Sequence, residues 1–246
     1  MTKDEEWLLK EKYHGERTTG FFADSARLEA GEPLAYVIGE IPFMNAKISL
    51  DSHPLIPRTE TEYWVDKVIQ TMQGSPLSKI EVLDLCAGSG CIGIAVLLNV
   101  PQATVDFAEI EERHHETIIK NLRENGVGDG RATVLGGDLF ERVDHTYDFI
   151  LSNPPYIDPA LDRSEEGVRA HEPHTALFGG VHGIEFIERI IADAPLHLRA
   201  GGFLYIEHEP EQVGRLQELA HMHGFNTTTL PDQYGIERLT VLVRGA

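Results

Sequence analysis

The stretch Asp84-Leu85-Cys86-Ala87-Gly88-Ser89-Gly90-Cys91-Ile92-Gly93 decides the fold of this chain. It follows an apolar segment, 80–85, that predicts a buried strand, and it leads into residues 91–99, which predict a helix. From Gly88 to Gly93 the glycines match the spacing G-x-G-x-x-G between a strand and a helix. Such a turn is typical of an open parallel sheet, in which ligands bind beyond the carboxyl ends of the strands.

Strand and helix patterns alternate from Lys79 onward. The predicted strands are 80–85, 104–108, 132–135, 148–152, 203–207, 226–230 and 239–243, and the predicted helices are 91–99, 112–125, 184–197 and 211–223. A further helix is expected from Thr59 to about residue 72, with Thr59 as its N-cap and Glu62 as the capping-box partner. The sequence therefore predicts an α/β fold, a doubly wound and mainly parallel sheet with a C-terminal antiparallel strand pair.

The first 54 residues carry a different pattern. Residues 4–13 and 24–30 predict two short helices, which must pack on something else because they are too short to be stable alone. Residues 34–50 predict a β-hairpin or a pair of strands. We therefore expect a truncated helical N-terminal segment (1–32), a β-hairpin linker (33–54) and a main domain (55–246).

Three acidic residues follow neighbouring strands of the predicted sheet. Asp84 ends the first strand, Glu109 ends the second and Asp138 lies just past the third. A dinucleotide would bring its pyrophosphate to the glycine turn, where a fixed carboxylate at Asp84 would oppose it. S-Adenosylmethionine carries no phosphate, and carboxylates favour its ammonium and sulfonium groups. Glu109 suits the ribose hydroxyls of either ligand, and Asp138 suits an adenine amino group. The glycine spacing alone fits either ligand, but the strand-end acids, Asp84 above all, lead us to expect the methyl donor rather than a nicotinamide dinucleotide.

The tetrapeptide Asn153-Pro154-Pro155-Tyr156 follows the fourth predicted strand. Its two prolines fix φ and make the strand end rigid. The Asn153 side-chain oxygen, the Pro154 carbonyl and the flat Tyr156 ring together fit a planar NH2 group. The nitrogen of such a group is a poor nucleophile, and acceptors that hold both hydrogens orient it and favour the positive charge of attack. We predict Asn153, Pro154 and Tyr156 as catalytic residues; a proline-stiffened loop that caps a strand is the alternative.

These motifs resemble class I S-adenosylmethionine methyltransferases and, more narrowly, the release factor glutamine methyltransferases of the HemK/PrmC family. The resemblance runs from about Arg27 to the C-terminus and includes residues 31–36, 56–62, 137–141, 172–173, 176–180, 234–235 and 237–238. Asn-Pro-Pro-Tyr is shared with adenine amino methyltransferases, whereas the segments around Arg58 and Glu172 are more specific.

The resemblance implies a Rossmann-like fold, with 55–246 as the methyltransferase domain. It also implies transfer of a methyl group from S-adenosylmethionine, leaving S-adenosylhomocysteine, to the Gln of a Gly-Gly-Gln loop in a peptide chain release factor, the protein substrate. The expected donor-binding residues are Asp84, Cys86, Ala87, Gly88, Gly90, Glu109, Asp138, Leu139 and Asn153. The expected substrate-binding residues are Arg58, Asn153, Pro154, Pro155, Tyr156 and Glu172.

Two departures from the family pattern affect these expectations. Cys86 stands where the family usually has a glycine, and only about 30 residues precede Gly31, where the family usually has a complete helical domain. The N-terminal residues are either a shortened substrate-docking element or a cap over the hairpin. Arg58 either pairs with a carboxylate near the site or lies outside it, and Glu172 is either a contact for the substrate loop or a plain surface acid.

Composition excludes several classes of protein and of partner. The 246 residues include 21 Lys+Arg and 40 Asp+Glu, a formal net charge of −19, which repels polyanions and disfavours nucleic acid. No apolar run spans a bilayer, the N-terminus lacks a secretion signal, and two cysteines exclude a disulfide framework. The 12 His residues form no recognisable ligand set, so we expect no metal. We expect a cytoplasmic monomer with no membrane partner.

Two alternatives stay open. One is an adenine amino methyltransferase acting on DNA or RNA, against which the net charge counts. The other is a catalytically silent module that binds the donor or a factor, against which Asn153, Tyr156 and the three strand-end acids count.

Overall fold

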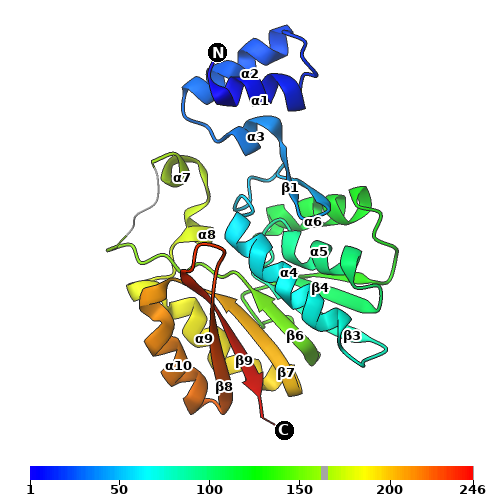
Figure 1. The fold of residues 1–246 in the computed structure, drawn as a ribbon, viewed down its shortest axis with the longest axis vertical. Helices are drawn as coiled ribbons and strands as arrows, with labels where there is room; N and C mark the ends of the chain where they lie inside the picture. The colour runs from blue at the N-terminus through cyan, green and yellow to red at the C-terminus, as the bar shows by residue number, and fades with distance from the viewer. Residues whose placement is uncertain (162–165, 246) are drawn as a thin grey trace.

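The computed structural model describes residues 1–161 and 166–245, and a seven-stranded sheet forms its centre (Figure 1). Across the sheet the strands are β5 (Ala132–Gly136), β4 (Ala103–Glu109), β3 (Ile80–Leu85), β6 (Tyr147–Ser152), β7 (Leu198–Glu207), β9 (Glu237–Arg244) and β8 (Phe225–Pro231). The first five strands run parallel to one another, whereas β9 is antiparallel to both β7 and β8. The predicted Rossmann-like sheet with a C-terminal antiparallel pair is confirmed.

Helices cover both faces of the sheet because side chains of each central strand point alternately into two cores. In β3, Ile80 and Val82 lie in a core shared with α4 (Thr59–Gln73), α5 (Cys91–Asn99) and α6 (Glu112–Glu124). Leu83 and Leu85 lie in a second core, shared with α9 (Glu185–His197) and α10 (Val213–Met222). With both faces covered, the carboxyl ends of the strands are the edge at which such a sheet binds ligands.

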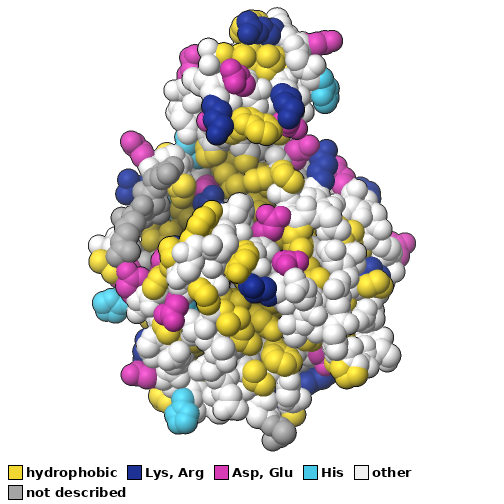
Figure 2. All heavy atoms as spheres, in the orientation of Figure 1, with side chains coloured by type: hydrophobic (Ala, Val, Ile, Leu, Met, Phe, Trp, Pro, Cys, Tyr) yellow, Lys and Arg dark blue, Asp and Glu magenta, His cyan; other side chains and the backbone are white. Residues whose placement is uncertain are grey.

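The N-terminal helices form a small core of their own. They are α1 (Lys3–Glu11), α2 (Thr19–Glu29) and α3 (Leu34–Ile38). Leu8, Phe21 and Val37 are the buried apolar residues of this core. Figure 2 shows charged side chains on these helices and hydrophobic side chains gathered where the helices meet the rest of the chain.

Helix α3 corrects the prediction of strand structure from residue 34. Pro33 precedes its first residue as the N-cap, and Gly39, with φ +95°, ends it in the left-handed conformation that favours glycine. Helix α2 also begins at Thr19 rather than at residue 24, because the Thr18 hydroxyl accepts a hydrogen bond from the backbone of Phe21. The division of the chain at residues 32 and 54 stays a prediction.

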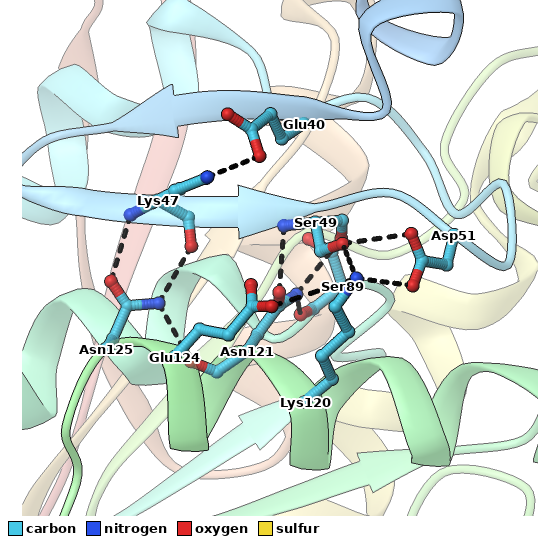
Figure 3. A network of polar contacts seen from close by, with 9 residues as sticks. All are labelled: Glu40, Lys47, Ser49, Asp51, Ser89, Lys120, Asn121, Glu124 and Asn125. Carbon is cyan, nitrogen blue, oxygen red and sulfur yellow. Dashed lines mark hydrogen bonds and ion pairs between the residues drawn. The ribbon is translucent and has the colours of Figure 1, made fainter.

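The predicted hairpin is present and is fastened to α6 through its backbone. Its strands are β1 (Glu40–Phe43) and β2 (Ala46–Ser49). Asn125 accepts from the Lys47 N–H at 2.9 Å and donates to the Lys47 carbonyl at 2.8 Å (Figure 3). Asn121 does the same for Ser49, at 2.8 and 3.1 Å, and also donates to the Ser89 carbonyl at 3.0 Å. One buried amide therefore holds both the hairpin and the glycine turn.

The start of α4 differs from the predicted capping box. The helix begins at Thr59, but Arg58 is the N-cap residue and no side chain caps it. The Thr59 hydroxyl donates to Glu60, and the Glu62 carboxylate accepts from the backbone N–H of Met44 in the hairpin. The predicted capping box is wrong because the Glu62 carboxylate binds the backbone N–H of Met44 in the hairpin turn instead of the backbone N–H of Thr59.

Strand β7 begins at Leu198 rather than at residue 203. Three further short helices in the described part of the chain are not predicted: α7 (Glu166–His171), α8 (His174–Leu177) and η1 (Val181–Gly183). The predicted helix 211–223 is present as the short η2 (Pro210–Gln212) followed directly by α10. Within residues 1–161 and 166–245, no helix has the length and apolar character needed to cross a membrane.

Candidate active site

The glycine turn after β3 brings α5 close against the sheet. Gly88 and Gly90 have φ of +55° and +78°, a conformation that costs glycine little. A Cβ at Gly93 would lie 2.4 Å from the ring of Phe107 in β4, so the helix approaches the strand more closely than any side chain would allow. The turn therefore has the geometry that its glycine spacing predicts.

A cavity of about 340 Å³ lies beside this turn, at the carboxyl ends of β3, β4 and β6. It falls in the range of roughly 300–1,000 Å³ typical of small-molecule sites. Glu109, Glu111 and Asp138 line it, and its described lining residues include no Lys or Arg. The predicted donor-binding residues on its wall are Cys86, Gly88, Glu109, Asp138, Leu139 and Asn153. Those absent from its wall are Asp84, Ala87 and Gly90.

Glu109 is held in the wall of this cavity by two backbone donors. Its Oε2 accepts from the Gly88 N–H at 2.7 Å and its Oε1 accepts from the Glu111 N–H at 2.8 Å. Burial raises the pKa of Glu109, and these two hydrogen bonds lower it. Each oxygen keeps a lone pair for a further donor, such as a ligand hydroxyl.

Asp138 and Leu139 form the rim of the cavity after β5. Asp138 is paired with Arg189, whose Nη2 lies 2.7 Å from its Oδ2. Leu139 has φ +51°, so the chain turns sharply at this point. A ligand amino group that reached Asp138 would share its carboxylate with the Arg189 guanidinium.

Asp84 lies beneath the glycine turn rather than at its mouth, which corrects the predicted position. Its side chain is fully buried, and its Oδ2 accepts from the Gly93 N–H at 2.8 Å. Its Oδ1 has no hydrogen-bond partner among the described residues. Burial raises the pKa of Asp84 to about 8, and the nearby Glu109 adds to the rise. A buried carboxylate oxygen without a partner fits a cationic ligand, because positive charge nearby favours the ionised form.

The Asn-Pro-Pro-Tyr tetrapeptide leaves β6 between two cavities. Asn153 lines both the 340 Å³ cavity and a second one of about 170 Å³. Arg58, Pro154 and Tyr156 line the second cavity, and Pro155 lines the first. The structure therefore brings the predicted catalytic residues together and places Asn153 where the two cavities meet.

The segment from Gly179 to Gly183 holds the backbone of this tetrapeptide. A Cβ would lie 2.5 Å from the Pro155 carbonyl if added at Gly179, and 2.0 Å from the Tyr156 carbonyl if added at Gly183. The Gln212 side chain donates to the same Tyr156 carbonyl at 2.7 Å. The tetrapeptide is thus fixed from outside as well as by its own prolines.

A buried carboxylate, Glu207, joins the tetrapeptide to α4. Glu207 ends β7 and is 1% exposed. Its Oε2 accepts from the Thr61 hydroxyl and the Trp64 indole N–H, each at 2.7 Å, and its Oε1 accepts from the Tyr156 hydroxyl at 2.9 Å. The Thr61 oxygen accepts in turn from Asn153 Nδ2 at 3.2 Å. Burial raises the pKa of Glu207, and its three hydrogen bonds lower it.

Arg58 and Glu172 form an ion pair beside the second cavity. The Glu172 side chain is 1% exposed, and its Oε1 accepts from Arg58 Nη2 at 2.6 Å. Its Oε2 accepts from the Ile56 N–H at 3.1 Å. Arg58 therefore pairs with a carboxylate, one of the two predicted possibilities. Of the two possibilities for Glu172, the plain surface acid is wrong: the side chain is buried and holds the segment that carries Leu55, which lines both cavities.

A larger cavity, of about 640 Å³, lies next to Ile157 and Arg238. None of the predicted site residues lines it, so the predicted chemistry falls in the two smaller cavities. Across the described part of the chain, no three or more His, Cys, Asp or Glu side chains are grouped to hold a metal ion.

Sequence reasoning missed Glu207, Thr61 and Trp64. Strand 203–207 ends in an acid at the carboxyl edge of the sheet, and the rule that identified Asp84 and Glu109 would have identified Glu207 as well. Thr61 and Trp64 carry no comparable signal, because the position of α4 over β7 depends on tertiary packing.

Comparison with known proteins agrees with this geometry. The profile of the Methyltransferase small domain matches residues 66–166. A release factor glutamine methyltransferase of Thermodesulfovibrio yellowstonii is 33% identical over 214 residues, which cover 86% of this chain and 76% of that protein. A ribosomal protein uL3 glutamine methyltransferase of Bradyrhizobium diazoefficiens is 34% identical over 206 residues, covering 78% and 61%. A methyltransferase from Pyrococcus furiosus shares the fold, with a TM-score of 0.62 and 16% identity over 91% of this chain and 99% of that chain.

Proposed function

The chain belongs to the family of release factor glutamine methyltransferases, and we propose that it methylates the Gln of a Gly-Gly-Gln loop in a peptide chain release factor. The methyl donor is S-adenosylmethionine, and the acceptor atom is the side-chain amide nitrogen. One observation carries the proposal: Asn153 lies between an acidic cavity and a narrow second cavity that Pro154 and Tyr156 also line. A donor in the first and an amide in the second would meet at this residue.

The first cavity has the chemistry that the donor requires. Its acidic lining, without Lys or Arg, suits a ligand that carries positive charge and no phosphate. Glu109 would accept from ribose hydroxyls and Asp138 from the adenine amino group. Asp84 does not line the cavity, so its carboxylate, with an unpartnered Oδ1, would favour the positive charge of the donor from behind the glycine turn rather than by direct contact. The backbone of Cys86, Ala87, Gly88 and Gly90 shapes the turn that closes this side of the cavity.

The residues of the second cavity suit a primary amide. Asn153 Nδ2 is engaged by Thr61, and Asn153 Oδ1 and the Pro154 carbonyl accept no hydrogen bond from the described residues. These two free acceptors would take the two N–H bonds of the glutamine amide. The Tyr156 ring supplies a flat face for the amide plane, and its hydroxyl is anchored on Glu207.

When bound, S-adenosylmethionine supplies an electrophilic methyl group. The amide nitrogen is a weak nucleophile, and positive charge would develop on it as the new C–N bond forms and the bond between the methyl group and sulfur breaks, which leaves neutral S-adenosylhomocysteine. Asn153 Oδ1 and the Pro154 carbonyl stabilise that charge through the two N–H bonds, because both are fixed before the reaction begins. The product is a secondary amide, so one of the two amide protons leaves for solvent.

The protein substrate is the point at which the relatives differ. The release factor enzyme and the ribosomal uL3 enzyme carry different substrates in their names, so uL3 is the second candidate. A competition assay separates them: the protein is incubated with trideuteromethyl S-adenosylmethionine and equal amounts of a release factor, uL3 and an adenine-containing oligonucleotide. Tandem mass spectrometry then locates the label. A release factor with Glu in place of the loop Gln is the matched control.

We expect label on the loop Gln of the release factor and none on the control. Label on uL3 alone would move the substrate to the second candidate. Label on the oligonucleotide alone would contradict protein methylation, and tight donor binding without any transfer would favour the silent module.

A further inference from the structure

We propose that Glu207 is a positioning residue that sets which end of the Asn153 amide faces the substrate. The inference rests on the proposed function, since it explains how the site recognises a glutamine amide. Glu207 acts at a distance of two hydrogen bonds from Asn153, through Thr61. Glu207 and Thr61 come from β7 and α4, elements outside the glycine turn and outside the tetrapeptide.

The directions of the hydrogen bonds around Glu207 follow from its chemistry. Oε2 of Glu207 accepts from both Thr61 and Trp64, and a carboxyl oxygen that carries no proton can only accept, so both of these partners must donate to it. The Trp64 indole N–H can do nothing else, and the Tyr156 and Thr61 hydroxyls each commit their single hydrogen to Glu207. Glu207 is 1% exposed, and it lines a cavity of about 180 Å³ together with Arg58, Tyr156 and Arg238.

Thr61 passes this direction on to Asn153. Because the Thr61 hydrogen is directed at Glu207, its oxygen can only accept from Asn153, at 3.2 Å. The NH2 end of the Asn153 amide must therefore face Thr61, and the oxygen end must face the cavities that Asn153 lines. With the amide reversed, an Asn153 oxygen would meet a Thr61 oxygen that has no hydrogen left to give.

The direction matters because the substrate group is itself an NH2. A glutamine amide nitrogen offers two donors and needs acceptors, which Asn153 supplies only in the observed orientation. The reversed amide would present donors to donors and leave the substrate hydrogens without acceptors in the second cavity, which is unfavourable. Glu207 also holds the Tyr156 hydroxyl, so one carboxylate orients both the acceptor and the flat face of the site.

Three variants test the proposal by steady-state kinetics with a Gly-Gly-Gln peptide, with S-adenosylhomocysteine affinity measured by calorimetry. Glu207→Gln replaces an acceptor-only group by one that also donates, and Thr61→Val keeps the shape of Thr61 without its hydroxyl. We expect each to lower kcat by about 10²-fold, the scale of losing one preorganised contact, with the donor Kd within about twofold of wild type. Thr61→Ser keeps the hydroxyl and should restore kcat to within about threefold.

The controls separate positioning from folding. Glu81→Gln makes the same chemical change near the amino end of β3, at the edge of the sheet opposite to the site. Glu81 pairs there with Lys79 and Arg199, and its replacement should leave kcat unchanged. Thermal melting checks that each variant is folded, and Thr61→Val and Thr61→Ser decide the matter if Glu207→Gln does not fold. Thr61→Val with a kcat within threefold of wild type would overturn the proposal, as would failure of Thr61→Ser to restore it.

A second readout keeps this inference distinct from the proposed function. If the wild-type protein methylates no glutamine substrate, the proposed function fails, and the amide orientation is then decided by NMR. We expect a nuclear Overhauser contact between the Asn153 Nδ2 protons and the Thr61 side chain in the wild type, lost in Glu207→Gln. A wild-type protein without that contact would overturn the role of Glu207, whatever the substrate.

Discussion

Replacing Arg58 by methionine should destabilise the protein, because it leaves the buried Glu172 carboxylate with a single hydrogen bond. Glu172 is 1% exposed and accepts from Arg58 at 2.6 Å and from the Ile56 N–H at 3.1 Å. Removing one partner of a buried ion pair costs about 3–5 kcal/mol. The Arg58 side chain is itself 33% exposed, so water can replace part of it and we expect the lower end, about 3 kcal/mol. For a chain of this size the melting temperature should fall by roughly 6–12 °C.

Urea unfolding of wild type, Arg58→Met, Glu172→Gln and the double variant measures the coupling between the two side chains. Gln at position 172 carries no charge to leave unpaired, so Arg58→Met should cost less in that background, with a coupling energy of about 1.5 kcal/mol. Arg215→Met is the matched control, because its ion pair with Glu188 lies on the surface, and its unfolding midpoint should not change. A loss below about 1 kcal/mol for Arg58→Met, or additive costs in the double variant, would refute this account of Glu172.

Three further predictions address the elements that support the site. Gly183→Ala places a Cβ 2.0 Å from the Tyr156 carbonyl oxygen and should lower peptide turnover by about 10²-fold. Gly201→Ala, also at positive φ but with open space around it, is the control and should not lower turnover. Equal effects of the two substitutions would contradict the role of Gly183 in positioning the tetrapeptide. Asn121→Leu removes the hydrogen bonds to Ser49 and Ser89, so it should lower the free energy of unfolding by about 3 kcal/mol and weaken donor binding in calorimetry. Asn125→Leu removes bonds to the hairpin but none to the glycine turn, and it should leave donor affinity unchanged. Unchanged donor binding in both variants would show that the hairpin is not coupled to the glycine turn. Burial raises the pKa of Asp84 from 3.8 to about 8, so its contribution to stability is full below pH 3.8 and is lost as the pH rises through about 8. The free energy of unfolding measured in urea should therefore decline between about pH 5 and 9, and Asp84→Asn should remove that decline. Parallel pH dependences for the two proteins would contradict the burial of a titrating carboxyl group.

The sheet and the glycine turn could be predicted from sequence because their determinants are local. Alternating apolar residues fix the strands, and Gly93 is required by the ring of Phe107 directly across from it. Helix α3 was misjudged because Tyr36, Val37 and Ile38 favour strands. Its position between Pro33 and Gly39, with the Lys12 ammonium bound to the Val37 carbonyl at 2.6 Å, decides otherwise.

The parts of the site that sequence could not give depend on depth and on contacts between distant segments. Asp84 was correctly placed at the end of β3, but its burial beneath the turn follows from how closely α5 lies on the sheet. The sequence leaves open whether Glu172 contacts the substrate or is a surface acid, because its partners Arg58 and Ile56 lie more than a hundred residues away. Glu207 is joined to Thr61 across a similar separation in sequence. Residue type predicts a chemical capability, whereas the partner that directs it is set by the fold.

The acidity of the chain has a partial explanation in this geometry. Glu109 and Asp138 line the cavity where a cationic donor would lie and Asp84 is buried behind its glycine turn, but these are three of 40 acidic residues. The competition between protein substrates and an oligonucleotide also tests whether the net charge of −19 excludes nucleic acid as a substrate.

The central claim is that Asn153 holds the glutamine amide while the methyl group is transferred. Single-turnover methylation of a Gly-Gly-Gln substrate by Asn153→Ala, with the donor affinity of the same protein measured by calorimetry, tests it most directly. We predict a methyl-transfer rate about 10²-fold or more below wild type, with a donor Kd within about twofold. A donor affinity that falls in parallel with the rate, or a rate that does not change, would contradict the claim.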